Sequence, residues 1–138
     1  KVDEIIHNIS VDLSVEQVYK VLVVEDNKIN QMVTRKIMEK NNFKFLIVDD
    51  GYAAIEALGK EHFDVVLMDI NMPLINGFET TRLIRKKEIN IPIIALTAFA
   101  KDEITDEAFA VGMNDVLIKP FEPSKLIQGI EKLMRNNR

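Results

Sequence analysis

Side chains that can do chemistry follow short apolar runs at four points of this sequence. They are the carboxylates of Glu25, Asp26 and Asp69, the hydroxyl of Thr97 and the amine of Lys119. Two carboxylates about 5 Å apart repel each other by roughly 3 kcal/mol at an effective dielectric constant of 20. A divalent cation relieves this repulsion, and Mg2+ fits best because it binds few protein oxygens and keeps waters that a phosphate can replace. The set therefore indicates a metal-assisted phosphoryl site, provided that the fold brings its members together.

Each of these side chains has a chemical role and a competing structural role. Asp69 can act as a nucleophile toward an activated phosphoryl group, a transfer that depends mostly on positioning and charge neutralisation. Lys119 would supply part of that neutralisation, and Thr97 would donate its hydroxyl to a phosphoryl oxygen. The structural alternatives are helix capping by Glu25 and Asp26, a β-branched strand end at Thr97, and a salt bridge from Lys119 to Asp26 or Asp69. The combination favours the chemical interpretation, because capping does not explain Asp69 and Lys119.

An alternation of strands and helices must position these residues. The predicted strands are 21–24, 45–48, 64–68, 93–96 and 116–118. The predicted helices are 28–40, 52–60, 77–87, 102–111 and 124–134. Short apolar runs with helical patterns between them are typical of buried parallel strands. In the first helix, Ile29, Met32, Val33 and Ile37 recur at helical spacing, which predicts an inward apolar stripe.

This pattern predicts an α/β fold of the (βα)5 type, a doubly wound parallel sheet covered by helices on both faces. Right-handed crossovers leave few topologies. The strand order 2-1-3-4-5 places strands one and three side by side, so Asp26 and Asp69 would be neighbours. Ligands of such sheets bind beyond the carboxyl ends of the strands, where all the selected side chains would lie. Only the run 45–48 ends in residues to which we assign no role.

Composition limits the alternatives. The chain has 138 residues, a formal charge of −4 and no cysteine. The length suits one domain, which we place at 20–138, with 1–19 as a linker or the tail of a preceding domain. The negative charge disfavours nucleic acid as a direct partner. The lack of cysteine fits the reducing cytoplasm. No apolar stretch is long enough to span a membrane, so we expect no membrane contact by this domain. Its parent protein could still be membrane-anchored. His7 in the first segment is expected to be incidental.

Four stretches together carry a resemblance to a known family. They are residues 21–27 (VLVVEDN), 68–73 (MDINMP), 96–98 (LTA) and 118–121 (IKPF), each at the end of a predicted strand. In this order they make the chain similar to the receiver domains of two-component response regulators and hybrid sensor histidine kinases, over about residues 20–137. The resemblance implies a flavodoxin-like fold with the strand order 2-1-3-4-5.

The resemblance also implies the function and the role of each site residue. Asp69 would accept a phosphoryl group from a phosphohistidine of a histidine kinase or a histidine phosphotransfer domain. Mg2+ would be bound by Asp26, Asp69 and the backbone carbonyl of Asn71, with Glu25 acting through water. Thr97 and Lys119 would hold the phosphoryl group, with a cis peptide bond between Lys119 and Pro120. Phosphorylation would change the conformation of the domain and so pass the signal on.

Some features leave alternatives open. Receivers commonly carry an aromatic switch residue where this chain has Val116. Phe99 is a candidate to replace that aromatic residue. Because of Val116, a pseudo-receiver scaffold without phosphotransfer remains the alternative function. Asn76 stands where many relatives have aspartate, with little expected effect.

The form Glu25-Asp26-Asn27 is closer to receivers of hybrid kinases than to free-standing regulators. An aspartate-nucleophile phosphatase is disfavoured because position 71 is asparagine. Whether the domain counts as an enzyme, and whether it forms a homodimer, stay open.

Overall fold

A parallel five-stranded sheet forms the centre of the domain in the computed structural model, which describes residues 18–136. The strands are β1 (Lys20–Val24), β2 (Lys44–Val48), β3 (Val65–Asp69), β4 (Ile93–Thr97) and β5 (Asp115–Ile118). Their order is β2-β1-β3-β4-β5, with every neighbouring pair parallel. The predicted (βα)5 fold and its 2-1-3-4-5 order are confirmed. Most of the predicted linker, and His7 within it, lies outside the described residues.

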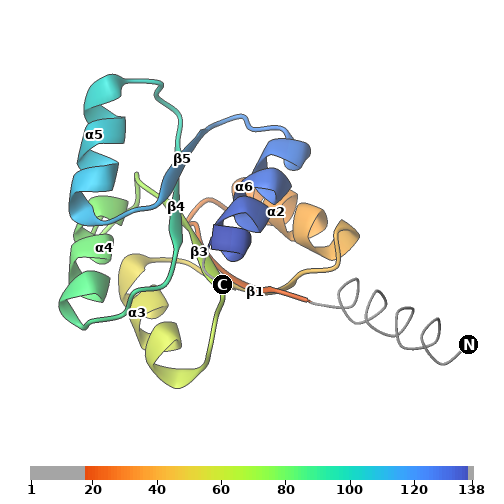
Figure 1. Cartoon of the computed structure of the whole chain (residues 1–138), viewed down its shortest axis with the longest axis horizontal. Coiled ribbons are helices and arrows are strands. Elements are labelled where there is room, and N and C mark those ends of the chain that lie inside the picture. Colours follow the sequence, from red (N-terminus) through yellow and green to blue (C-terminus); the bar gives the residue numbers. More distant parts are fainter. Residues whose placement is uncertain (1–17, 137–138) are drawn as a thin grey trace, which may run out of the picture.

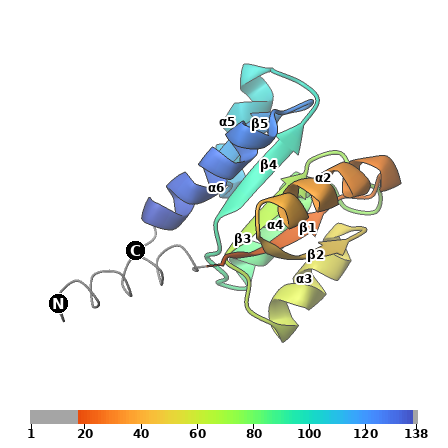
Figure 2. The same ribbon diagram turned by 90° about the vertical axis from the view of Figure 1, so that its right-hand side faces the viewer.

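Helices cover both faces of the sheet (Figures 1 and 2). They are α2 (Lys28–Lys40), α3 (Gly51–Lys60), α4 (Gly77–Lys86), α5 (Asp102–Val111) and α6 (Pro123–Asn136). Helices α3, α4 and α5 pack on one face, and α2 and α6 pack on the other (Figure 1). Among the described residues, no helix has the length and apolar character needed to cross a bilayer.

The alternation of side chains along the central strands creates two apolar cores. In β1, Leu22 and Val24 face the core under α3, α4 and α5, whereas Val21 and Val23 face the core under α2 and α6. Successive side chains of a strand point to opposite faces, so a strand covered on both faces must be apolar throughout. Strands β1 and β3 meet this condition and are buried almost completely. Their rigid packing fixes the strand ends from which the candidate site residues project.

Side-chain caps define where several helices begin. The side chain of Asp50 accepts a hydrogen bond from the backbone N–H of Ala53, so α3 begins at Gly51, one residue earlier than predicted. Asn76 and Glu79 form a reciprocal capping box at the start of α4, which satisfies two backbone donors that the helix cannot pair itself. The expected stop of α5 is also present, since Gly112 adopts a left-handed conformation directly after the helix.

The predicted inward face of α2 is wrong for three of its four residues. Ile29, Met32 and Val33 are 72, 57 and 51% exposed, and of the predicted stripe only Ile37 is buried. The helix is rotated so that its buried positions are Gln31, Thr34, Ile37 and Met38. The physical reason lies in the hydrogen bonds of Gln31, whose side chain binds polar groups near the carboxyl end of the sheet. Helix α2 therefore presents an apolar surface to solvent.

Candidate functional site

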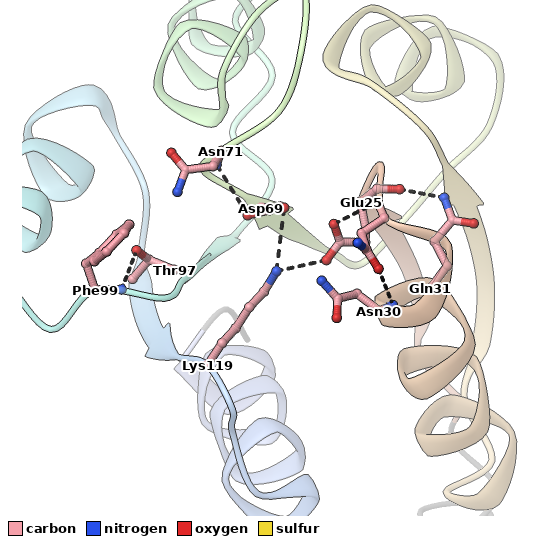
Figure 3. A network of polar contacts seen from close by, with 9 residues as sticks. Glu25, Asn30, Gln31, Asp69, Asn71, Thr97, Phe99 and Lys119 are labelled. Carbon is pink, nitrogen blue, oxygen red and sulfur yellow. Dashed lines mark hydrogen bonds and ion pairs between the residues drawn. The ribbon is translucent and has the colours of Figure 1, made fainter.

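Four strand ends bring the predicted site residues to one edge of the sheet (Figure 3). Glu25 follows β1, Asp69 ends β3, Thr97 ends β4, and Lys119 follows β5. Backbone hydrogen bonds extend the sheet to these positions, since the N–H of Lys119 donates to the carbonyl of Thr97 at 2.7 Å and the N–H of Glu25 donates to the carbonyl of Val48 at 3.1 Å. The expectation that the charged side chains converge is met, since Lys119 contacts both Glu25 and Asp69 and Asp26 lies in the same acid cluster.

The three predicted carboxylates form a tight cluster. Glu25, Asp26 and Asp69 each place one carboxylate oxygen within 4.8 Å of the others. Glu25 is 2% exposed and Asp69 is 6% exposed, while Asp26 is the most accessible of the three. Three acids held this close favour the binding of a cation, and hard oxygen donors with one accessible side suit Mg2+. The residues present therefore fit a bound magnesium ion.

Lys119 neutralises part of this negative charge. Its Nζ lies 2.9 Å from Glu25 Oε1 and 3.5 Å from Asp69 Oδ2. The predicted contact with Asp69 is present, but the shorter contact is with Glu25, and no ion pair with Asp26 occurs among the described residues. The lysine side chain is 20% exposed, so its amine reaches the acids from the side of the solvent. The peptide bond between Lys119 and Pro120 is cis, as the resemblance implied.

The shared environment separates the pKa values of the two buried acids. Burial, followed by a hydrogen bond with Glu25 and the charge of Glu25, raises the pKa of Asp69 to about 7, although the charge of Lys119 acts against this rise. Burial also opposes the ionisation of Glu25, but hydrogen bonds with Asp69 and Lys119 and the charge of Lys119 outweigh it and lower the pKa of Glu25. Without a bound metal ion, Glu25 therefore ionises before Asp69, and the carboxyl group of Asp69 is still partly protonated at neutral pH.

Two further predicted residues, Asn71 and Thr97, lie at the same edge of the sheet (Figure 3). The backbone N–H of Asn71 donates to Asp69 Oδ1 at 3.3 Å, which fixes the carboxylate against the loop that follows β3. Thr97 is 1% exposed, and its Oγ1 accepts a hydrogen bond from the backbone N–H of Phe99 at 3.1 Å. The hydroxyl hydrogen of Thr97 is not used in that bond and can donate to an incoming oxygen. Phe99 is half exposed, with Lys101 Nζ 5.6 Å from its ring centre.

Three residues that support the site, Gln31, Asp49 and Lys28, were not predicted from the sequence. Gln31 Nε2 donates to the backbone carbonyl of Glu25 at 2.5 Å and to Asp49 Oδ1 at 2.7 Å (the first of these bonds is drawn in Figure 3). Lys28 Nζ lies 3.0 Å from the same oxygen of Asp49. Asp49 follows β2, the one strand whose end was given no role. The available signal was a glutamine between the apolar residues Ile29 and Met32, which could have suggested a polar inward position.

Comparison with known proteins decides the family. Residues 21–131 match the response regulator receiver domain. The chain belongs to the receiver domain family. Within it, Val116 occupies the predicted position of the aromatic switch, is half buried, and pairs with Ala95 of β4.

Curated relatives and solved structures agree with this assignment. The chain is 36% identical over 131 residues to hybrid signal transduction histidine kinase B of Dictyostelium discoideum, covering 85% of this chain but only 7% of that kinase. It is 33% identical to the solved receiver domain of the sensor histidine kinase PA1611 of Pseudomonas aeruginosa, with a TM-score of 0.80 over 86% of this chain and 99% of that one. That structure holds a magnesium ion in its active-site cleft.

A third relative was solved together with a partner. It is the receiver domain of the Saccharomyces cerevisiae response regulator Ssk1, in complex with the histidine phosphotransfer protein Ypd1. The identity is 26% and the TM-score 0.80, over 85% of this chain and 89% of that one. The chain is therefore a receiver domain of two-component signalling, similar to those of hybrid histidine kinases.

Proposed function

We propose that this receiver domain accepts a phosphoryl group on Asp69 from a phosphohistidine in a Mg2+-dependent reaction and changes conformation to signal. The observation that carries the proposal is the cluster of Glu25, Asp26 and Asp69, of which Glu25 and Asp69 are buried, with Lys119 Nζ 3.5 Å from the carboxylate of Asp69. Three acids with Lys119 as their one cation repel each other unless a second cation binds. With a metal ion bound, the positive charge in the cleft would also attract a phosphoryl group. The magnesium-bound relative supports this choice of ion.

The chemistry is a displacement at phosphorus. Asp69 attacks through a carboxylate oxygen, the bond between phosphorus and the imidazole nitrogen of the donor breaks, and that nitrogen keeps the electron pair. The product is an acyl phosphate on Asp69. Lys119 holds one phosphoryl oxygen, and Thr97 donates its hydroxyl hydrogen to another. Such a transfer needs alignment and charge neutralisation more than proton transfer.

Magnesium would be held by Asp26, Asp69 and the backbone carbonyl of Asn71, with Glu25 acting through water, and it would neutralise charge on the phosphoryl oxygens. Because the pKa of Asp69 is raised to about 7, a bound cation would increase the ionised fraction of this nucleophile at neutral pH. Lys119 provides one such charge, but it is already engaged with Glu25 at 2.9 Å. Hence we expect phosphorylation to depend steeply on Mg2+.

The exposed apolar surface of α2, formed by Ile29, Met32 and Val33, is the docking surface that we propose for the phosphohistidine donor. A cavity of about 400 Å3 connects Val33 with Lys119 and Phe121, so the surface continues to the acceptor site. Exposed apolar patches of this kind commonly mark protein interaction sites. The complex of a related receiver with a histidine phosphotransfer protein supports a donor of that class. The parent protein is proposed to be a hybrid histidine kinase, and its cytoplasmic location stays a prediction.

The first experiment measures intact mass after incubation with acetyl phosphate and Mg2+. We expect one phosphoryl adduct on the wild type and none on Asp69→Asn. An equal adduct on the variant would refute Asp69 as the acceptor. An absent adduct on both proteins, with Mg2+ bound, would favour the pseudo-receiver scaffold.

A second experiment tests the docking surface with Met32→Ser. We expect slower transfer from a phosphorylated histidine phosphotransfer protein, such as the yeast protein, and unchanged labelling by acetyl phosphate. Leu83→Ser on α4 is the matched control, because Leu83 is also partly exposed but lies on the opposite layer. Equal transfer to both variants would contradict the proposed surface.

A further inference from the structure

We propose that Gln31 is a positioning residue that holds the backbone between Glu25 and Asp26 and thereby sets the Mg2+ affinity of the acid cluster. The inference rests on the proposed function, since it assigns a residue to the same metal site. It goes beyond that function because Gln31 touches neither the acceptor carboxylate nor any atom expected to bind the ion.

Gln31 uses a single nitrogen atom to join three segments. It lies on α2, and its Nε2 donates to the carbonyl of Glu25 after β1 and to the carboxylate of Asp49 after β2, at 2.5 and 2.7 Å. The residue is 8% exposed. An amide nitrogen has two hydrogens, and these two acceptors use both. The side chain is therefore held at both hydrogens of its donor group.

The carbonyl that Gln31 binds belongs to the peptide group that joins Glu25 to Asp26. The N–H on the other side of Glu25 donates to the carbonyl of Val48, so both peptide groups that flank this residue are fixed. The carboxylate of Glu25 is held as well, by Lys119 Nζ and by the backbone N–H of Asn27 at 3.2 Å. Because this peptide group is fixed, the side chains of Glu25 and Asp26 project from the backbone in fixed directions despite their mutual repulsion.

The partner of Gln31 after β2 is also held in place. Asp49 accepts a second contact from Lys28 Nζ at 3.0 Å, and Lys28 comes from the same helix as Gln31. A hydrogen bond to an ionised carboxylate is stronger than one between neutral groups. The pKa of Asp49 lies below its ordinary value, and the hydrogen bond from Gln31 is the largest cause. Asp49 thus acts as an anchor that orients the amide toward Glu25.

A purely structural role would be filled more simply by an apolar residue. Positions Ile37 and Met38 on the same inward face of α2 are apolar and buried. A buried amide is unfavourable unless its hydrogen bonds are made, so glutamine at this position is useful only for the two bonds it forms. Outer residues that hold metal ligands typically change metal affinity by about 10- to 100-fold when they are altered.

The test compares Gln31→Met with Thr34→Val. Methionine keeps the length and burial of the side chain but donates no hydrogen bond, and Thr34 is an equally buried residue of the same helix face. Mg2+ is titrated while amide shifts are followed by NMR, and the metal-free spectrum reports the Asp26 amide directly. We expect about tenfold weaker Mg2+ binding and a displaced Asp26 amide signal for Gln31→Met, and wild-type values for Thr34→Val.

Asp49→Ala is the second variant, since it removes the anchor from an exposed position without disturbing the core. We expect it to weaken Mg2+ binding in the same direction but less than Gln31→Met. Mg2+ affinity equal to wild type in Gln31→Met, or an equal loss in Thr34→Val, would overturn the positioning role alone. A wild-type protein whose amides do not respond to Mg2+ would overturn the proposed function and this inference together.

Discussion

Replacing the carboxylate of Asp69 with an amide should stabilise the protein when no metal is present. In Asp69→Asn the shape of the side chain is kept, but a charge that repels Glu25 and Asp26 is removed. The pKa of Asp69 rises from 3.8 to about 7 on folding, mainly through burial and the nearby Glu25. At 1.36 kcal/mol per pKa unit, this shift corresponds to a ceiling of about 4 kcal/mol.

A separate estimate from geometry agrees with this ceiling. Two charges at the largest separation in the cluster, 4.8 Å, repel by about 3 kcal/mol at an effective dielectric constant of 20. The variant also loses the ion pair between Asp69 and Lys119 at 3.5 Å, which offsets part of the gain. We therefore expect Asp69→Asn to raise the free energy of unfolding by about 2 kcal/mol at pH 8 in EDTA.

The pH dependence has a definite sign. Because the folded-state pKa is raised, folded wild-type protein binds a proton that the unfolded chain releases, and its stability falls as pH rises from about 4 to about 7. The advantage of Asp69→Asn should grow over this range and stay constant above it. Excess Mg2+ should stabilise the wild type, since the ion binds only the folded state. The difference in the free energy of unfolding between Asp69→Asn and the wild type should then become smaller.

The assay is urea unfolding followed by far-UV circular dichroism, at pH 5 and pH 8, with EDTA or with Mg2+. Asp106→Asn is the control, because it removes one exposed acid of α5 outside the cluster. If Asp69→Asn were no more stable than the wild type at pH 8 in EDTA, the acids would not repel as their separation requires. The reasoning on the site's electrostatics would then be refuted.

Three further substitutions should change the free energy of unfolding in the same assay. Lys119→Ala should cost about 2 kcal/mol at pH 8, because it leaves the buried charge of Glu25 without its cation; an unchanged midpoint would show that the pair contributes no net stability. Gly77→Ala should cost about 2 kcal/mol, because the added carbon would lie 2.6 Å from the carbonyl oxygen of Asp69; a wild-type midpoint would contradict that close approach. Asn76→Ala should cost about 1 kcal/mol through loss of the capping box at α4, and no loss would show that water replaces the cap.

The sheet and the location of the site could be predicted because both depend on local patterns. Strands buried on both faces are apolar throughout, so the runs that form β1 and β3 stand out from the polar sequence around them. The first polar residue after each run then lies at the carboxyl edge of the sheet. For this reason Glu25, Asp69 and Lys119 could be grouped without knowledge of any contact.

The orientation of α2 could not be predicted because periodicity does not distinguish an inward apolar stripe from an exposed one. Ile29, Met32 and Val33 follow helical spacing, and we assumed that spacing meant burial. The true inward position near the site is held by Gln31, whose partners are a backbone carbonyl and a carboxylate. These partners lie 6 and 18 positions from Gln31, which is not a helical spacing, so only the folded chain shows that they meet.

The ion pair between Lys119 and Glu25 joins residues that are 94 positions apart. During synthesis on the ribosome, β1 and its two acids emerge early, and the lysine emerges only after β5. A nascent chain that ends before β5 therefore lacks the amine that faces Asp69. Under the proposed function, we therefore expect competence for phosphoryl transfer only once β5 and Lys119 have been made, and no signalling from products truncated before this strand.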